Sequence, residues 1–110
     1  MESADDVCFI YSTFPDTEAA LKVGRALVDA KLAACVNVYP PMTSIYIWQG
    51  KREEGPEVAA FIKTRRALVD DVIAMARPLH PYSTPCFLVL PILSGNEDYL
   101  AWARKQTRTS

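Results

Sequence analysis

The sequence predicts an α+β fold, a ferredoxin-like sandwich with the element order β-α-β-β-α-β followed by a C-terminal helix. Two observations predict it. Segments rich in β-branched and aromatic residues alternate with segments whose apolar residues repeat at helical spacing, and proline or glycine marks most of the boundaries. With 110 residues, the chain is expected to form one domain, residues 1–110, around one core.

The first part of the chain predicts a strand, a helix and two further strands that are separated by two prolines. Val7 to Thr13 is typical of a strand. Asp16 is a suitable N-cap for a helix whose apolar residues repeat at helical spacing to about Lys31. Ala34 to Tyr39 and Thr43 to Trp48 are again typical of strands. The two prolines between these strands are expected to end the earlier one.

A charged segment separates the third predicted strand from the fourth. Gln49 and Gly50 indicate a turn, and we expect a loop from Lys51 to Glu54. The fourth strand is expected from Pro56 to Thr64, where β-branched and aromatic residues return.

The last part of the chain predicts a helix, a strand and a helix. Apolar residues repeat at helical spacing from Leu68, and we expect this helix to end before Pro78, whose ring does not suit a helix interior. Cys86 to Ile92 is an apolar run of strand length, and its proline at position 91 favours an edge or a strand end. Ser94 to Asn96 then indicates a helix start, with acidic residues in the first turn and basic residues in the last.

The predicted sheet is apolar on both faces. In Thr43 to Trp48, isoleucines alternate with Tyr46 and Trp48, so that apolar side chains point in both directions. In the next strand, Phe61 shares with Tyr39 the side away from the helices. Monomers rarely expose such a patch, so we expect a second copy of the chain to cover the helix-free face. The alternative is that the third helix folds back over it.

Composition excludes several classes of protein. Twelve basic and thirteen acidic residues leave no positive field for nucleic acid. The longest apolar stretch is far shorter than a membrane span, and the acidic start is unlike a signal peptide. The three cysteines, Cys8, Cys35 and Cys86, form no Cys-x-x-Cys pair, which favours reduced thiols and a cytoplasmic location.

Five short blocks make the chain resemble a known family. They are, in chain order, Leu32 to Cys35, Ser44 to Lys51, Glu57 to Thr64, His80 to Pro85 and Asp98 to Trp102. With these blocks the sequence resembles the CutA family of divalent-cation tolerance proteins from about Val7 to Arg104. The resemblance implies a ferredoxin-like subunit in a homotrimer similar to the PII signalling proteins. It also implies a role in tolerance of metal ions, with copper or another divalent cation as ligand and no required cofactor.

The family's copper ligands are only partly present. The resemblance implies a cysteine at the end of the first strand's apolar run and two adjacent histidines, and this chain has Ser12, Leu79 and His80 at those positions. Cys35 and Cys86 are candidates to complete a metal site with His80, because thiolate and imidazole suit soft ions. The alternatives are that the cysteines are small buried hydrophobes and that His80 bonds to the backbone.

The aromatic residues of the chain are compatible with functions other than metal tolerance. Tyr39, Tyr46, Trp48, Phe61 and Tyr82 are candidates for a trimer interface or cleft. The alternative function is a PII-like regulatory module that binds a small metabolite or anion between subunits, with Lys51 or Lys63 beside the aromatic rings. We do not expect an enzyme, because the sequence has no nucleophile elbow and no paired metal histidines.

Overall fold

The computed structural model describes residues 3–109 and contains each helix and strand that the sequence predicts by residue range, but three strands lie between its first two helices where the β-α-β-β-α-β order has two. The elements are β1 (Val7–Phe14), α1 (Thr17–Asp29), β2 (Cys35–Val38), β3 (Met42–Trp48), β4 (Lys51–Arg65), η1 (Arg66–Leu68, a single 3-10 turn), α2 (Val69–Leu79), β5 (Leu88–Pro91) and α3 (Glu97–Gln106). The α+β class is therefore confirmed. Within residues 3–109, no helix is long and apolar enough to cross a membrane.

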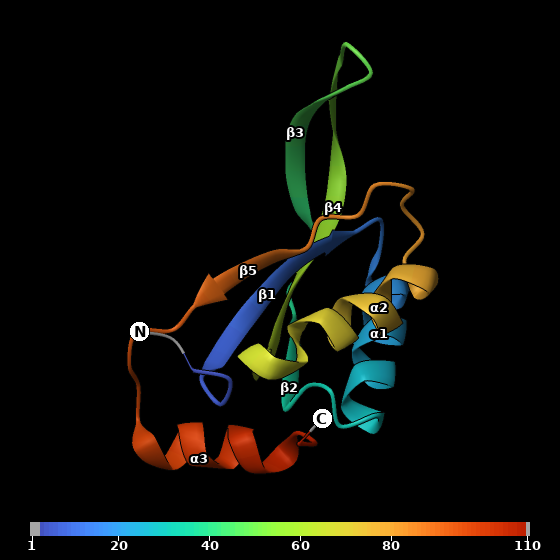
Figure 1. The fold of residues 1–110 in the computed structure, drawn as a ribbon. Coiled ribbons are helices and arrows are strands. Elements are labelled where there is room, and N and C mark those ends of the chain that lie inside the picture. The colour runs from blue at the N-terminus through green and yellow to red at the C-terminus, as the bar shows by residue number, and fades with distance from the viewer. Residues whose placement is uncertain (1–2, 110) are drawn as a thin grey trace.

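One antiparallel sheet organises the fold. Its strands run in the order β2-β4-β1-β5, and β3 pairs with the remaining part of β4. Figure 1 shows α1 and α2 side by side against the sheet, while the hairpin of β3 and β4 projects beyond it and α3 lies apart near the opposite end. The molecule therefore has a helix-covered face, a helix-free face and a protruding hairpin.

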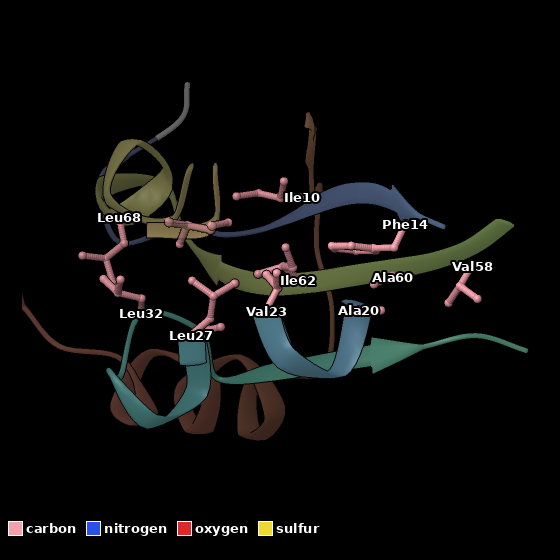
Figure 2. Packing of buried hydrophobic residues seen from close by; sticks show 13 residues of the cluster. Ile10, Phe14, Ala20, Val23, Leu27, Leu32, Val58, Ala60, Ile62 and Leu68 are labelled. Atoms are coloured by element: carbon pink, nitrogen blue, oxygen red, sulfur yellow. The ribbon is translucent and has the colours of Figure 1, made fainter. Parts of the chain in front are cut away.

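The core lies between the sheet and the first two helices. Inward side chains of β1 and β4 alternate with outward ones, so that Ile10, Ile62 and Val58 meet Val23 and Leu27 of α1 (Figure 2). Gly24 allows this close approach, because a Cβ at that position would lie 3.1 Å from Cγ1 of Val36. The residues of β1 and β4 that face the helices therefore form the core together with α1 and α2.

The expected loop at Lys51 to Glu54 is wrong, because these residues form the start of β4. The pairing of β3 continues to the tip of the hairpin, where Trp48 is opposite Lys51. Gln49 and Gly50 form the two-residue turn, with φ values of 51° and 78°. Positive φ at both positions suits the right-handed twist of a hairpin, so charged residues beyond the turn can continue the ladder.

Two further boundaries differ from the sequence expectation. Helix α2 passes through Pro78 and ends at Leu79. Because only one helical residue follows this proline, its missing N–H affects the last turn alone. The strand β5 covers Leu88–Pro91 and not Cys86 to Ile92. Its proline stands at the end of an edge strand, where a missing donor costs least.

Helix α3 has the predicted caps and covers one end of the helix-free face. The Asn96 side chain accepts a hydrogen bond from the Asp98 N–H at 2.9 Å. Lys63 Nζ donates to the Tyr99 hydroxyl at 3.3 Å and lies 5.4 Å from the ring centre of Phe9. Helix α3 therefore covers the helix-free face at that end only, and the alternative that it covers the whole face is not what the structure shows. Tyr39, on the same face, is 50% exposed.

Replacing a core residue tests the packing. Ile62→Ala is expected to lower the free energy of unfolding by about 2–5 kcal/mol, because it leaves a cavity where the side chain is fully buried. Urea unfolding at one protein concentration measures the change. The control is Leu93→Ala, which removes a side chain that is 99% exposed and should alter stability by less than about 0.5 kcal/mol. Equal effects of the two substitutions would contradict this core.

Candidate functional site

The only histidine of the chain is buried where α2 ends. Its ring stacks on Phe14, with 4.5 Å between ring centres and 17° between planes. Nε2 lies 2.9 Å from the carbonyl oxygen of Thr13, and Nδ1 accepts a hydrogen bond from the Tyr82 N–H at 3.2 Å. These partners assign the tautomer in which Nε2–H donates and Nδ1 accepts. The alternative that His80 bonds to the backbone is confirmed.

Burial sets the charge of this ring. Desolvation lowers the pKa of His80 below its ordinary value of 6.5, against a smaller opposing effect of the Thr13 carbonyl and the Glu57 carboxylate. At neutral pH the imidazole is therefore neutral, and both of its nitrogens are occupied by backbone groups. A metal ion could bind either nitrogen only by displacing one of these hydrogen bonds.

The three candidate metal ligands do not form one site within a chain. No group of three or more His, Cys, Asp or Glu side chains within residues 3–109 is placed to hold a metal ion. Cys35 lies half-buried on the edge strand β2, where its thiol is 3.8 Å from Asn37 Oδ1. Cys86 lies in the segment before β5, and burial, together with Glu57, raises the pKa of its thiol.

The two positions that depart from the family's copper ligands are part of the fold. Ser12 is fully buried in β1, and its hydroxyl lies 3.5 Å from Nε2 of His80. Leu79 packs against the hydrophobic core. The residues present at these positions therefore do not suit a copper ion inside one subunit, since they offer one weak oxygen donor and no second imidazole.

A cleft of about 610 Å³ lies where the hairpin meets the segment after His80. Three of the aromatic candidates, Tyr46, Trp48 and Tyr82, contribute to it. Its lining residues are Tyr11, Thr13, Ser44, Ile45, Tyr46, Trp48, Glu57, Pro81, Tyr82, Ser83, Thr84 and Cys86. The size is within the usual range of small-molecule sites, roughly 300–1,000 Å³.

The remaining aromatic candidates lie on the open sheet face. Tyr39 and Phe61 contact each other, with ring centres 5.7 Å apart, and Tyr11 lies 5.3 Å from Phe61. This row runs across β2, β4 and β1 on the side away from the core. The sequence-based set therefore divides into a cleft group and a sheet-face group.

Glu57 is the residue of the cleft that sequence reasoning did not single out. Its Oε2 accepts a hydrogen bond from the Tyr82 hydroxyl at 2.8 Å. Burial and this carboxylate raise the pKa of Tyr82. The only signal was its position at the start of a family block. Neither Lys51 nor Lys63 is among the residues that line this cleft, so the cleft of one subunit gives no support to the alternative of a lysine clamp for a small anion.

The fold and the cleft define a class of small α+β proteins with one antiparallel sheet, a protruding hairpin and an aromatic cleft at its base. The sequence matches the family model described as "CutA1 divalent ion tolerance protein" over residues 8–106. This chain belongs to the CutA1 family.

Relatives from three kingdoms of life support this membership. "Protein CutA" of Homo sapiens is 42% identical over 99 residues, which are 90% of this chain and 55% of the relative. "Divalent-cation tolerance protein CutA" of Thermus thermophilus is 42% identical over 95 residues, 86% of this chain and 92% of the relative. The crystal structure of CutA1 from Oryza sativa is similar with a TM-score of 0.91 at 37% identity, and the match covers 96% of each chain. The chain thus spans about half of the human relative.

The lowered pKa of His80 predicts a stability that depends on pH. Between the folded and the unfolded pKa, the unfolded chain binds more protons, so the free energy of unfolding falls as pH falls below about 6.5. His80→Gln should show a smaller loss between pH 7 and pH 5, because it has no imidazole to protonate. Urea unfolding across this range measures both slopes. Parallel curves for the two proteins would show that His80 does not titrate differently on folding.

Proposed function

We propose that this protein acts in divalent-cation tolerance as a homotrimer of ferredoxin-like, PII-like subunits. The observation that carries the assembly is the exposed apolar surface of the hairpin and the helix-free face. Ile45 and Ile47, two positions apart in β3, are 63% and 68% exposed. The family membership and the names of the relatives carry the tolerance role.

The sheet edges support assembly through the same surface. Each of β2 and β5 has one strand neighbour in the sheet, so each presents an edge that another chain can pair with or cover. Leu88 and Leu90 of β5 are exposed and lie opposite Tyr11 and Phe9 on the helix-free face. We therefore propose Tyr39, Phe61 and these leucines as interface residues. A trimer that buries these residues would remove the apolar helix-free face of the sheet from water.

We propose that metal ions are bound between copies of the chain and not within one. His80 is committed to backbone groups, whereas the thiols of Cys35 and Cys86 are half-buried and are present three times in a trimer. Thiolates are suitable ligands for Cu(I) and Zn(II).

The proposed role is not catalytic. Nucleophilic thiols have a lowered pKa and a nearby base, but the pKa of the Cys86 thiol is raised and both nitrogens of His80 are occupied. A cytoplasmic location stays a prediction. Relatives include a protein named chloroplastic from Arabidopsis thaliana and a protein titled periplasmic from Archaeoglobus fulgidus.

The assembly is tested by placing a charge on the exposed isoleucine face. Ile47→Glu should convert the trimer to smaller species, because it would place a charged carboxylate in the proposed apolar interface, where the opposite Arg52 already pairs with Glu54. Light scattering at several protein concentrations measures the mass. The control is Asp29→Glu, a change at the end of α1 that keeps the charge and should leave the mass unchanged. A monomeric unmodified chain would overturn the assembly proposal.

The metal ligands are tested by competition with a chelator of known affinity. Cys35→Ser combined with Cys86→Ser should weaken Cu(I) and Zn(II) binding by more than about tenfold, because two thiolates per subunit are removed. His80→Gln should leave both affinities within about twofold. The reverse ranking would place the ion at His80 instead.

The tolerance role is tested in cells that lack this chain. Growth in graded Cu(II) and Zn(II) should be impaired and should be restored by the unmodified chain. The variant Ile47→Glu should restore growth less well at equal abundance, because the proposed metal site needs the assembled form. Equal growth with and without the chain at every concentration would count against the role.

A further inference from the structure

The cleft has an unusual combination of aromatic rings and charge. Four aromatic side chains line it, from Tyr11, Tyr46, Trp48 and Tyr82. The only charged side chain among its lining residues is Glu57, and no lysine or arginine is present there. Aromatic faces carry negative potential and attract cations, most strongly when the cation is weakly hydrated.

The carboxylate of Glu57 has no cationic partner among the described residues. Its hydrogen-bond partner is the Tyr82 hydroxyl, a neutral group that leaves the negative charge in place. The influence of this charge extends through the cleft, because Glu57 contributes to the raised pKa of Tyr11, Tyr82 and Cys86. Glu57 therefore gives the lining of the cleft one negative charge, which a bound cation would neutralise.

The strand register places Tyr46 and Trp48 on the cleft side of the hairpin and Ile47 on the opposite side, and Ile45 also contributes to the cleft lining. Tyr46 and Trp48 alternate with Ile45 and Ile47 along β3, so the two pairs point to opposite faces. Lys51 is opposite Trp48 at the tip of the hairpin and is not part of the cleft lining. The aromatic side of the hairpin thus borders the cleft, while Ile47 on the opposite side is 68% exposed and can contact another copy.

Inorganic divalent cations match this lining less well than organic ones. Calcium takes six to eight oxygen ligands, and magnesium needs a regular octahedron. The cleft offers one carboxylate with several hydroxyl groups, and most of its remaining surface is aromatic or apolar. An alkylated ammonium ion has no such coordination demand, since its methyl groups contact rings and its charge is spread over them.

We propose that this cleft is a binding site for a small alkylammonium cation, held between the rings of Tyr46, Trp48 and Tyr82 and neutralised by the Glu57 carboxylate. The site goes beyond the proposed role in metal tolerance. It needs neither a thiol nor a metal ion, and its ligand class is organic.

Titration calorimetry with tetramethylammonium chloride tests the proposal on the assembled, unmodified protein. Saturable binding is expected. Sodium chloride at the same ionic strength and tert-butyl alcohol, an uncharged molecule of similar shape, should bind at least about fivefold more weakly. Equal binding of the alcohol and the ammonium ion would overturn the proposal, as would the absence of saturable binding of tetramethylammonium.

Three variants locate the binding. Glu57→Gln, which keeps an acceptor for the Tyr82 hydroxyl, and Trp48→Leu should each weaken tetramethylammonium binding by about fivefold or more. The matched control is Glu54→Gln, because Glu54 is on the same hairpin but pairs with Arg52 and lies opposite Ile45. Its affinity should stay within about twofold. Equal losses in Glu54→Gln and Glu57→Gln would indicate a diffuse surface effect and overturn the site.

The outcome is independent of the tolerance role. Light scattering on each variant confirms that the assembly is unchanged, and the comparison of the two small molecules on the unmodified chain requires no variant. Failure of ammonium binding would leave the metal titration and the growth experiment unaffected, and failure of those would leave this site standing.

Discussion

The fold depends on the alternation of side chains along β4. This strand has 15 residues and pairs with β1, β2 and β3, so its register sets the position of every neighbour. Val58 and Ile62 point into the core, which requires Glu57 and Phe61 to point to the helix-free face. The same strand thus builds the core, the open sheet face and the floor of the cleft. A shift of one residue would exchange all of these roles.

The segment after α2 connects the core to the cleft. His80 is held by stacking on Phe14 and by backbone groups on both ring nitrogens. The N–H that bonds to the ring belongs to Tyr82, whose hydroxyl then reaches Glu57. A neutral buried imidazole therefore orients the segment that forms one wall of the cleft. This gives the histidine a positioning role that needs no metal ion.

The protruding hairpin carries two surfaces of different chemistry. Ile47 lies on one face, Tyr46 and Trp48 lie on the other beside the cleft, and Ile45 also contributes to the cleft lining. Exposed apolar side chains of this kind favour association of the chain with another copy. The same hairpin can therefore serve both assembly and a ligand cleft. Both faces belong to the same pair of strands, β3 and β4. A change in the tilt of the hairpin would therefore move both surfaces together.

Local patterns in the sequence determined the α+β class, the order of elements and the caps, because strand alternation, helical spacing and capping act over a few residues. They also indicated the aromatic residues and Asn96 as a cap. They did not show that Lys51 continues a strand, since the turn at Gln49 decides where pairing resumes. Nor could they show that His80 is committed to the backbone or that Glu57 meets Tyr82. The contacts of His80 with Thr13 and of Glu57 with Tyr82 join residues 25 or more positions apart, and only the packing of β1, β4 and the segment after α2 brings them together.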